Sequence, residues 1–506
     1  MNTVKIIFIL LFLSGSQLNA TNYYVSNAGD NGNDGLTLDN AFQTLQYAAD
    51  GVITGDTVFV TNGIYAGFDL RDRNGTALKP IVFMAMGTEV IIAQSGPIRA
   101  DGINIENADY VIIDGFMIND MPGNGNGIRV VLSNHCVVRN CRCDHNAERG
   151  IFTAFTDDIL IEHNICTNSV DEHGIYVSNS SDRPIIRYNE CYGNNNIGIH
   201  LNGDLSEGGD GIISDAMIYG NALHDNNLAA GINLDGVENP IIYNNIIYNN
   251  HAAQGIALFQ GDGAIVSSGA KIYNNTILIP DDGRWGILLN EGANINTEIY
   301  NNIIINQHSW RGCIAAESTD ALLCDYNILN DKLSDNGDGS TISLEAWQAL
   351  GLDEHSQLAN DLVDIFYNIE NGDYHFHLIA ASQAVDSGTD LVSATVTVDF
   401  EGFPRPWPWD GAYDIGADEY GIGLATVDPF VNDFKVFPNP TTNFFALDAK
   451  DFTIKEVILL DLNGQLLKTF SNKKQLNVSD INSGIYILRI KGKQGKVLYR
   501  KVVVNN

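Results

Sequence analysis

In the segment 126–327, the dipeptide Gly-Ile begins seven short runs: GIRVV (127–131), GIFTA (150–154), GIYVS (174–178), GIHLN (198–202), GINLD (231–235), GIALF (255–259) and GILLN (286–290). The spacings between them are 23, 24, 24, 33, 24 and 31 residues. An asparagine after a second apolar run recurs in step, at Asn140, Asn164, Asn189, Asn221, Asn245, Asn275, Asn302 and Asn327. Because alternation over about five residues is typical of strands, the segment is predicted to be an internal repeat of short strands.

One repeat of this kind cannot bury its own apolar face. Stacking the repeats places the isoleucine of each Gly-Ile in one interior column and each marker asparagine at a bend, where its amide can bond the asparagines above and below. These features resemble the right-handed parallel β-helix superfamily, which includes pectate lyases, alginate lyases, alginate C5-epimerases and several glycoside hydrolases. The resemblance covers roughly residues 21–420 and implies an all-β right-handed parallel β-helix with an amino-terminal cap and a closing segment.

The amino terminus indicates export. Residues 1–20 combine Lys5, an apolar run from Ile6 to Leu13 and small or polar residues up to Ala20, as in a secretory signal peptide. That run is too short to span a membrane, and no other stretch could do so, so we expect no membrane span in the mature protein. We expect a secreted protein, extracellular or at the cell surface, that is a monomer.

The composition changes after residue 420. Residues 421–433 are predicted to be a linker, and residues 434–506 form a Lys-rich tail with strand patterns typical of a small β-sandwich. The pieces FPNP (437–440), DLNGQLL (461–467), SGIYILRI (483–490) and KVVV (501–504) resemble the type A sorting domain of the type IX secretion system of Bacteroidetes. This resemblance implies the type IX secretion machinery as a partner and a polysaccharide-foraging setting, which favours a glycan-active enzyme.

Charge and cysteine usage exclude several classes of protein. The formal net charge is −34 and the pI is about 4.4, which argues against nucleic acid and anionic membranes as partners. Cys143, Cys166 and Cys191 each follow a marker asparagine by two or three residues, so we expect a stack of interior thiols and no disulfide there. No cysteine or histidine spacing is typical of a zinc site.

Two repeats are longer than the rest, and insertions in solenoids often lie on the functional face. The loop after GIHLN contains Asp204 and Asp210, and the loop after GIALF contains Asp262. Carboxylate-rich loops suit Ca²⁺, which is the one cofactor that the sequence suggests.

The outward positions of the Gly-Ile strands converge on a polar patch. Adjacent turns lie about 4.8 Å apart, so the patch is expected to bring together Arg149, His173, Tyr176 and His200 as catalytic residues. The residues expected to bind substrate around them are Asn202, Asn233, Asp235, Phe259, Arg284 and Trp285. Aromatic and polar side chains together suit a carbohydrate groove, so a polysaccharide is the expected substrate.

The residue types favour cleavage of a uronic-acid polymer by β-elimination. Removing the C5 proton of a uronate requires that its carboxylate be neutralised, and Arg149 could do this. His173 or His200 could act as the base, and Tyr176 as the acid. The alternatives are hydrolysis by paired carboxylates such as Asp235 with Asp204 or Glu172, alginate-type C5-epimerisation, and glycan binding without catalysis. For the epimerase, the segment DEHGIYVS (171–178) has Glu172 where the resemblance calls for proline.

Overall fold

The computed structural model describes residues 20–369, 374, 376–407, 411–420, 434–439, 441, 443–449, 454–460, 466–471, 474–492 and 497–504. The predicted signal peptide up to residue 19, the predicted linker 421–433 and the 461–465 part of the sorting-domain motif lie outside these residues.

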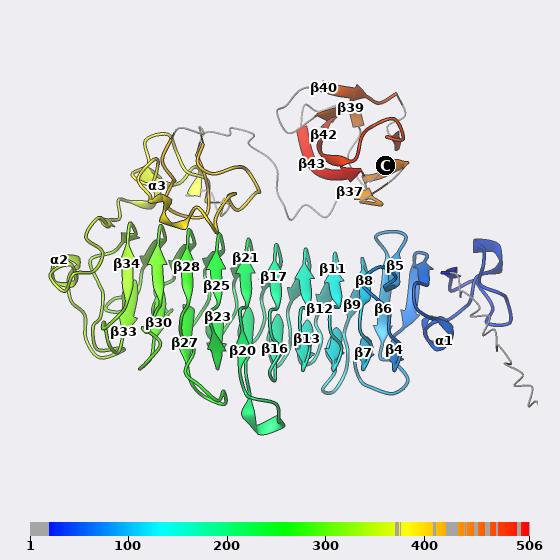
Figure 1. Cartoon of the computed structure of the whole chain (residues 1–506), viewed down its shortest axis with the longest axis horizontal. Helices are drawn as coiled ribbons and strands as arrows, with labels where there is room; N and C mark the ends of the chain where they lie inside the picture. Colours follow the sequence, from blue (N-terminus) through cyan, green and yellow to red (C-terminus); the bar gives the residue numbers. More distant parts are fainter. Residues whose placement is uncertain are drawn as a thin grey trace, which may run out of the picture.

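Three parallel sheets run along the solenoid (Figure 1). Sheet 1 contains β1 (Asn22–Val25), β2 (Thr57–Val60), β5 (Ile81–Ala85), β8 (Val111–Asp114), β11 (Val137–Arg139), β14 (Leu160–Glu162), β17 (Ile185–Arg187), β21 (Met217–Tyr219), β25 (Ile241–Tyr243), β28 (Lys271–Tyr273), β31 (Glu298–Tyr300) and β34 (Leu323–Asp325). Sheet 2 is formed by the Gly-Ile runs and their neighbours: β4 (Phe68–Arg71), β7 (Ile103–Glu106), β10 (Ile128–Val131), β13 (Ile151–Ala154), β16 (Ile175–Ser178), β19 (Ile199–Asn202), β23 (Ala229–Asp235), β27 (Ala253–Phe259), β30 (Ile287–Leu289) and β33 (Ile314–Ala316). Sheet 3 contains β3 (Gly63–Ala66), β6 (Val90–Gln94), β9 (Met117–Asn119), β12 (Arg142–Asp144), β15 (Ile165–Thr167), β18 (Glu190–Tyr192), β22 (Ala222–His224), β26 (Ile246–Tyr248), β29 (Thr276–Ile279), β32 (Ile303–Asn306), β35 (Ile328–Leu329) and β36 (Gln357–Leu358).

The interior follows the predicted columns. The Gly-Ile isoleucines pair in register from Ile128 to Ile287, and each is fully buried. Cys143, Cys166 and Cys191 also pair in register as buried thiols, and all seven cysteines are free, which confirms the predicted thiol stack. The added methyl of an alanine would meet the backbone of the next turn at Gly150 and Gly174, so the recurring glycine lets neighbouring turns approach.

Two asparagine ladders satisfy the polar groups of the bends. From Asn164 through Asn327, each marker asparagine donates through its backbone N–H or its amide to the side chain of the next turn; the Asn245 amide lies 3.0 Å from Asn275 Oδ1. A second ladder joins Asn194, Asn226 and Asn250 at the other end of sheet 3. Both ladders keep buried backbone groups hydrogen-bonded at bends that are closed to water. The sequence analysis identified only the first ladder.

The ends of the solenoid are covered differently. At the first turns, α1 (Leu45–Gly51), with Thr44 as its N-cap, packs Leu45, Ala48 and Ala49 into the core, as predicted for an amino-terminal cap. A short 3₁₀ helix, η1 (Leu38–Asn40), precedes it. At the last turns, α2 (Leu344–Gln348) buries Trp347 in the same core. These elements protect the strand edges from pairing with other chains.

The closing segment, residues 362–420, packs along the side of the solenoid and does not cover its last turn. Its α3 (Leu362–Ile365) lies beside the strands in Figure 1, and its apolar residues pack on Ile246, Ile303 and Ile305 of sheet 3. Amides of the solenoid bends bond its backbone, for example Asn274 Nδ2 to Asp414 O at 2.9 Å. Outward isoleucines and bend asparagines therefore hold the segment against the side of the helix. A 3₁₀ helix, η4 (Asp390–Val392), lies within it.

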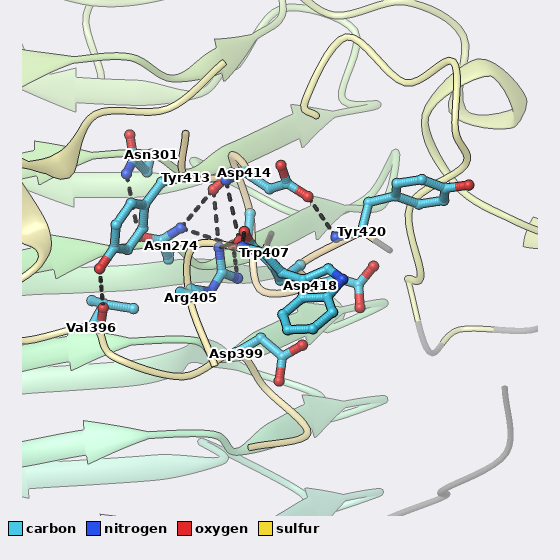
Figure 2. A network of polar contacts seen from close by, with 12 residues as sticks. Asn274, Asn301, Val396, Asp399, Arg405, Trp407, Tyr413, Asp414, Asp418 and Tyr420 are labelled. Atoms are coloured by element: carbon cyan, nitrogen blue, oxygen red, sulfur yellow. Dashed lines mark hydrogen bonds and ion pairs between the residues drawn. The ribbon is translucent and has the colours of Figure 1, made fainter. Parts of the chain in front are cut away.

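An ion pair lies at the centre of the closing segment (Figure 2). Arg405 Nη1 lies 3.0 Å from Glu419 Oε2, and both side chains are fully buried. Arg405 also donates to the carbonyl oxygens of Asp414 and Gly416. The pair connects the loop that contains Arg405 to the loop that contains Glu419, and both loops belong to the closing segment.

The tail forms two antiparallel sheets, in agreement with the predicted small β domain. One contains β37 (Phe434–Phe437), β38 (Phe444–Ala449) and β41 (Gln475–Asn477), and the other β40 (Leu466–Thr469), β39 (Ile454–Leu460), β42 (Gly484–Gly492) and β43 (Val497–Val504). Their shared core includes Phe445, Val457, Leu488 and Val502.

Candidate functional site

The register of sheet 2 places the predicted catalytic residues on neighbouring turns. Phe152, Tyr176, His200 and Asn233 pair directly across β13, β16, β19 and β23. Because these strands are parallel and in register, their outward side chains form one column. The register thus places Tyr176 and His200 side by side on neighbouring turns, as the sequence predicted.

Stacking joins the members of this column. The rings of Tyr176 and His200 are stacked with centroids 4.7 Å apart, and His173 meets both rings edge-on at 5.1 and 4.8 Å. The Arg149 guanidinium lies 4.9 Å from the Tyr176 ring centroid and 5.2 Å from that of Phe152. The four predicted catalytic residues therefore form one contiguous cluster, which we call the sheet 2 cluster: Arg149, His173, Tyr176 and His200.

Hydrogen bonds settle the positions of the ring protons. The Ile197 N–H donates to His173 Nδ1 at 3.3 Å, so the proton of a neutral His173 is on Nε2. That Nε2 lies 2.9 Å from Glu172 Oε2 and 3.2 Å from His200 Nδ1. His200 Nδ1 is therefore an acceptor, and the ring proton of His200 is on Nε2.

Both histidines are held in the neutral form. Burial lowers the pKa of His173, which is 5% exposed, although Glu172 opposes this effect. Burial, reinforced by His173 and Arg149, lowers the pKa of His200 well below its usual range. The sequence analysis considered Glu172 only as a carboxylate for hydrolysis and did not predict its contact with His173.

Two N–H donors of the cluster have no acceptor. Arg149 Nε and His200 Nε2 are buried and lack a hydrogen-bond partner among the described residues. The other nitrogens of Arg149 face carboxylates, with Nη1 3.3 Å from Glu148 and Nη2 3.9 Å from Glu172. Buried donors without acceptors are costly, so an acceptor at either nitrogen would be stabilising.

Of the predicted substrate-binding residues, Asn202 and Asn233 belong to the same face. Asn202 Nδ2 donates to the Tyr176 hydroxyl at 3.1 Å, and Asn233 pairs with His200 in the sheet register. Phe259 lies at the end of β27 and is half-buried. Asn202 therefore orients Tyr176 and lowers its pKa, whereas burial has the larger effect and raises it.

Asp235 has a different role from the one predicted. Its carboxylate accepts the backbone N–H groups of Gly261, Asp262 and Gly263 at 2.7, 2.8 and 3.1 Å, and the residue is 3% exposed. It holds the loop after β27, so its oxygens are already occupied. The short pair β20 (Ile213–Ser214) and β24 (Val237–Glu238) lies beside this loop region.

The outward placement of Trp285 is wrong. The residue is fully buried, and its Nε1 donates to Asp338 Oδ1 at 2.7 Å. A loop after β35 covers it, which the strand register alone did not indicate. Arg284 remains partly exposed, with Nη2 3.8 Å from Asp338 Oδ2, five strands along sheet 2 from β13.

The loop aspartates lie at turns. Asp204 caps the 3₁₀ helix η2 (Leu205–Glu207) by accepting from the Ser206 N–H, and Asp210 accepts from the Ile212 N–H at 3.0 Å. Asp210 and Asp262 are exposed. Among the described residues, the one group of three His, Cys, Asp or Glu with ligand atoms within 4.8 Å of one another lies elsewhere, in the closing segment.

Family comparisons divide the chain into three matched regions. A family model described as Pel9A-like, right-handed β-helix region matches residues 23–170, and one described as right-handed β-helix region matches residues 169–333. The model of the secretion system C-terminal sorting domain matches residues 435–505. This chain is a right-handed β-helix protein with a secretion sorting domain. The sorting domain indicates a secreted or cell-surface β-helix protein.

Solved structures with the same fold include pectate lyase Pel9A. It is 14% identical over 80% of this β-helix protein and 98% of the Pel9A chain, with a TM-score of 0.53, which is a likeness of fold. A rhamnogalacturonan lyase is 14% identical over 57% of this chain and 83% of its own, with a TM-score of 0.45. An alginate lyase from Paenibacillus sp. str. FPU-7 is 18% identical over 53% and 93%, with a TM-score of 0.40. No curated protein matches the sequence significantly.

In the sheet 2 cluster of this β-helix protein, His173 is buried, whereas Arg149, Tyr176 and His200 are partly exposed. Two cavities of about 290 and 540 Å³ lie elsewhere, the first between sheet 3 and α3 beside Tyr248, and the second beside Tyr326 and Tyr413. Within the described residues, no helix has the length and apolar character needed to span a membrane.

Proposed function

We propose that the protein is a secreted polysaccharide lyase that cleaves a uronic-acid-containing polymer by β-elimination at the sheet 2 cluster. One observation carries the proposal: Arg149 Nε and His200 Nε2 are buried donors without acceptors, in contact with the same tyrosine ring. A uronate carboxylate would accept from both. The sorting domain and the fold shared with pectate lyase Pel9A support a protein that acts on polysaccharide outside the cell.

In this mechanism, Arg149 and His200 bind the carboxylate and stabilise the negative charge that develops on it as the C5 proton leaves. Tyr176, as tyrosinate, takes that proton through its hydroxyl oxygen. The same proton then passes to the leaving oxygen as the C4–O bond breaks, which gives a C4–C5 double bond on one fragment and a new reducing end on the other. His173 is a positioning residue because both of its nitrogens are engaged.

This assignment reverses the roles expected from the sequence, in which His173 or His200 was the base and Tyr176 the acid. A base needs a free lone pair toward the substrate, and His200 directs a protonated Nε2 away from His173. Hydrolysis by paired carboxylates is less favoured because Asp235 is bound to the loop after β27.

The test is incubation with alginate, pectate and glycosaminoglycans while absorbance near 235 nm and reducing ends are both measured. A lyase raises both signals, whereas a hydrolase raises reducing ends alone. If neither signal appears, cleavage is contradicted. Epimerisation, which NMR of the recovered polymer detects, or glycan binding without catalysis would then remain. Each assay is run with and without Ca²⁺, for which Asp204, Asp210 and Asp262 stay candidate ligands.

We expect activity to rise steadily with pH. Burial raises the pKa of Tyr176 above its usual value of about 10, so the tyrosinate fraction increases about tenfold for each pH unit across neutral pH. Burial lowers the pKa of both His173 and His200, so their titration is shifted toward acid pH. Initial rates at 235 nm between pH 6 and 9.5 measure this dependence, and a plateau reached near pH 7 would instead identify a histidine as the base.

A further inference from the structure

Three side chains converge in the closing segment, far from the sheet 2 cluster in the sequence. His377 Nε2 lies 2.8 Å from Glu401 Oε1, and one carboxylate oxygen of Asp418 lies within 4.8 Å of the ligand atoms of both. The three residues come from three separate loops, and all are half-buried. We propose that His377, Glu401 and Asp418 bind one zinc ion.

The loops that present these ligands are held by further hydrogen bonds. Asp418 Oδ2 accepts the backbone N–H of Leu378 at 2.7 Å, which ties it to the loop of His377. Asp399 Oδ1 accepts the N–H groups of Glu401 and Phe403 at 3.0 and 2.8 Å, which fixes the loop of Glu401. Ligands that are oriented in this way are typical of metal sites, where outer hydrogen bonds set the geometry.

Asp399 supplies a second and independent observation. It is 1% exposed, and its Oδ2 is buried without a hydrogen-bond partner among the described residues. Because its other oxygen, Oδ1, accepts the Glu401 N–H, the unsatisfied oxygen belongs to the same loop as Glu401. A bound cation, or water bound to it, would satisfy this oxygen.

The Nη atoms of the nearby Arg405 are already engaged, whereas its buried Nε has no hydrogen-bond partner among the described residues. Arg405 donates to Glu419 and to two backbone carbonyl oxygens, all within 3.0 Å. Among the described residues, Arg405 forms its ion pair with Glu419 and with none of Asp399, Glu401 and Asp418. A divalent cation would compensate their charge at this point.

The donor set indicates the kind of ion. One imidazole nitrogen and two carboxylate oxygens suit zinc, which takes three protein ligands and leaves a fourth position for water. Calcium prefers six to eight oxygen ligands, which this set does not offer. A zinc ion here would cross-link three loops and stabilise the closing segment on the solenoid.

His224 gives a matched contrast. It also contacts two carboxylates, but through different ring nitrogens: Nδ1 lies 2.7 Å from Asp225 and Nε2 lies 3.3 Å from Glu190. Those carboxylates lie on opposite sides of the ring and cannot share one ion. His224→Ala therefore removes a comparable histidine without removing a zinc ligand.

The experiment uses the full chain without a histidine tag, treated with a chelator, desalted and titrated with ZnCl₂ by calorimetry, with the unfolding midpoint recorded in parallel. We expect one zinc per chain and a higher midpoint with zinc. His377→Ala and Glu401→Gln are expected to weaken binding at least tenfold and to abolish the rise, while His224→Ala retains both. Circular dichroism checks that each variant is folded.

Several outcomes would overturn the proposal: absence of zinc binding by the wild type, wild-type zinc affinity in both ligand variants, or a rise in midpoint with CaCl₂ and none with ZnCl₂. The readouts are independent of polysaccharide cleavage. Failure of the lyase assay therefore leaves the zinc site standing, and failure of zinc binding leaves the lyase proposal standing.

Discussion

A Tyr176→Phe variant is expected to lower kcat/KM on the cleaved polymer by about 10²–10⁴-fold, which is the usual contribution of a positioned proton-transfer group. The phenyl ring can keep its stack on His200 and its contact with Arg149, so the shape of the face is retained. What is lost is the oxygen that accepts the C5 proton and receives the Asn202 amide. Initial rates at 235 nm measure the loss.

The matched control for this variant is Tyr192→Phe. Tyr192 stacks on His224 at 5.0 Å on the outer face of sheet 3, so it repeats the tyrosine–histidine stack away from the sheet 2 cluster. Its activity should equal that of the wild type. Full activity in Tyr176→Phe, or an equal loss in both variants, would show that Tyr176 is not the proton-transfer group.

The second large effect is on stability. Arg405→Met is expected to lower the free energy of unfolding by about 3–5 kcal/mol, because removing one partner leaves the other charge of a buried pair uncompensated. Here the residue left behind is Glu419, which is 3% exposed. The carbonyl oxygens of Asp414 and Gly416 would also lose their donor. Urea unfolding at pH 7.5, followed by circular dichroism, measures the change.

Arg183→Met is the control for this loss. Arg183 forms ion pairs with Asp157, Asp158 and Asp182, but its side chain is 47% exposed. Exposed pairs contribute little, so we expect a loss of less than about 1 kcal/mol. If the two variants were equally stable, Arg405 would not organise the closing segment.

Much of the solenoid could be predicted because repeated residues occupy equivalent environments. The isoleucine column, the thiol stack and the contact of Tyr176 with His200 each follow from spacing, and the structure confirms them. The first asparagine ladder is confirmed from Asn164 onward, whereas the predicted marker Asn140 is exposed and Cys141 takes its place. The second asparagine ladder was also periodic but fell outside the chosen marker. The position of the closing segment was not predictable in this way, since it depends on contacts between residues about 140 positions apart, such as Asn274 and Asp414.

The candidate site, like the fold, could be predicted only in part from the sequence. Spacing brought Arg149, His173, Tyr176 and His200 together, but it could not assign their ring protons, which depend on the Ile197 N–H from the next turn. Burial of Trp285 required the loop that contains Asp338, and the convergence of His377 with Glu401 and Asp418 required three loops without any repeat.

The sequence by itself determined the β-helix, its register and the residues on its outer face, because a repeat makes each turn a template for the next. Only the tertiary structure decided which of those residues are exposed, which nitrogens are protonated and where non-repeating loops bring ligands together. These properties depend on contacts between distant segments, and such contacts leave no period in the sequence.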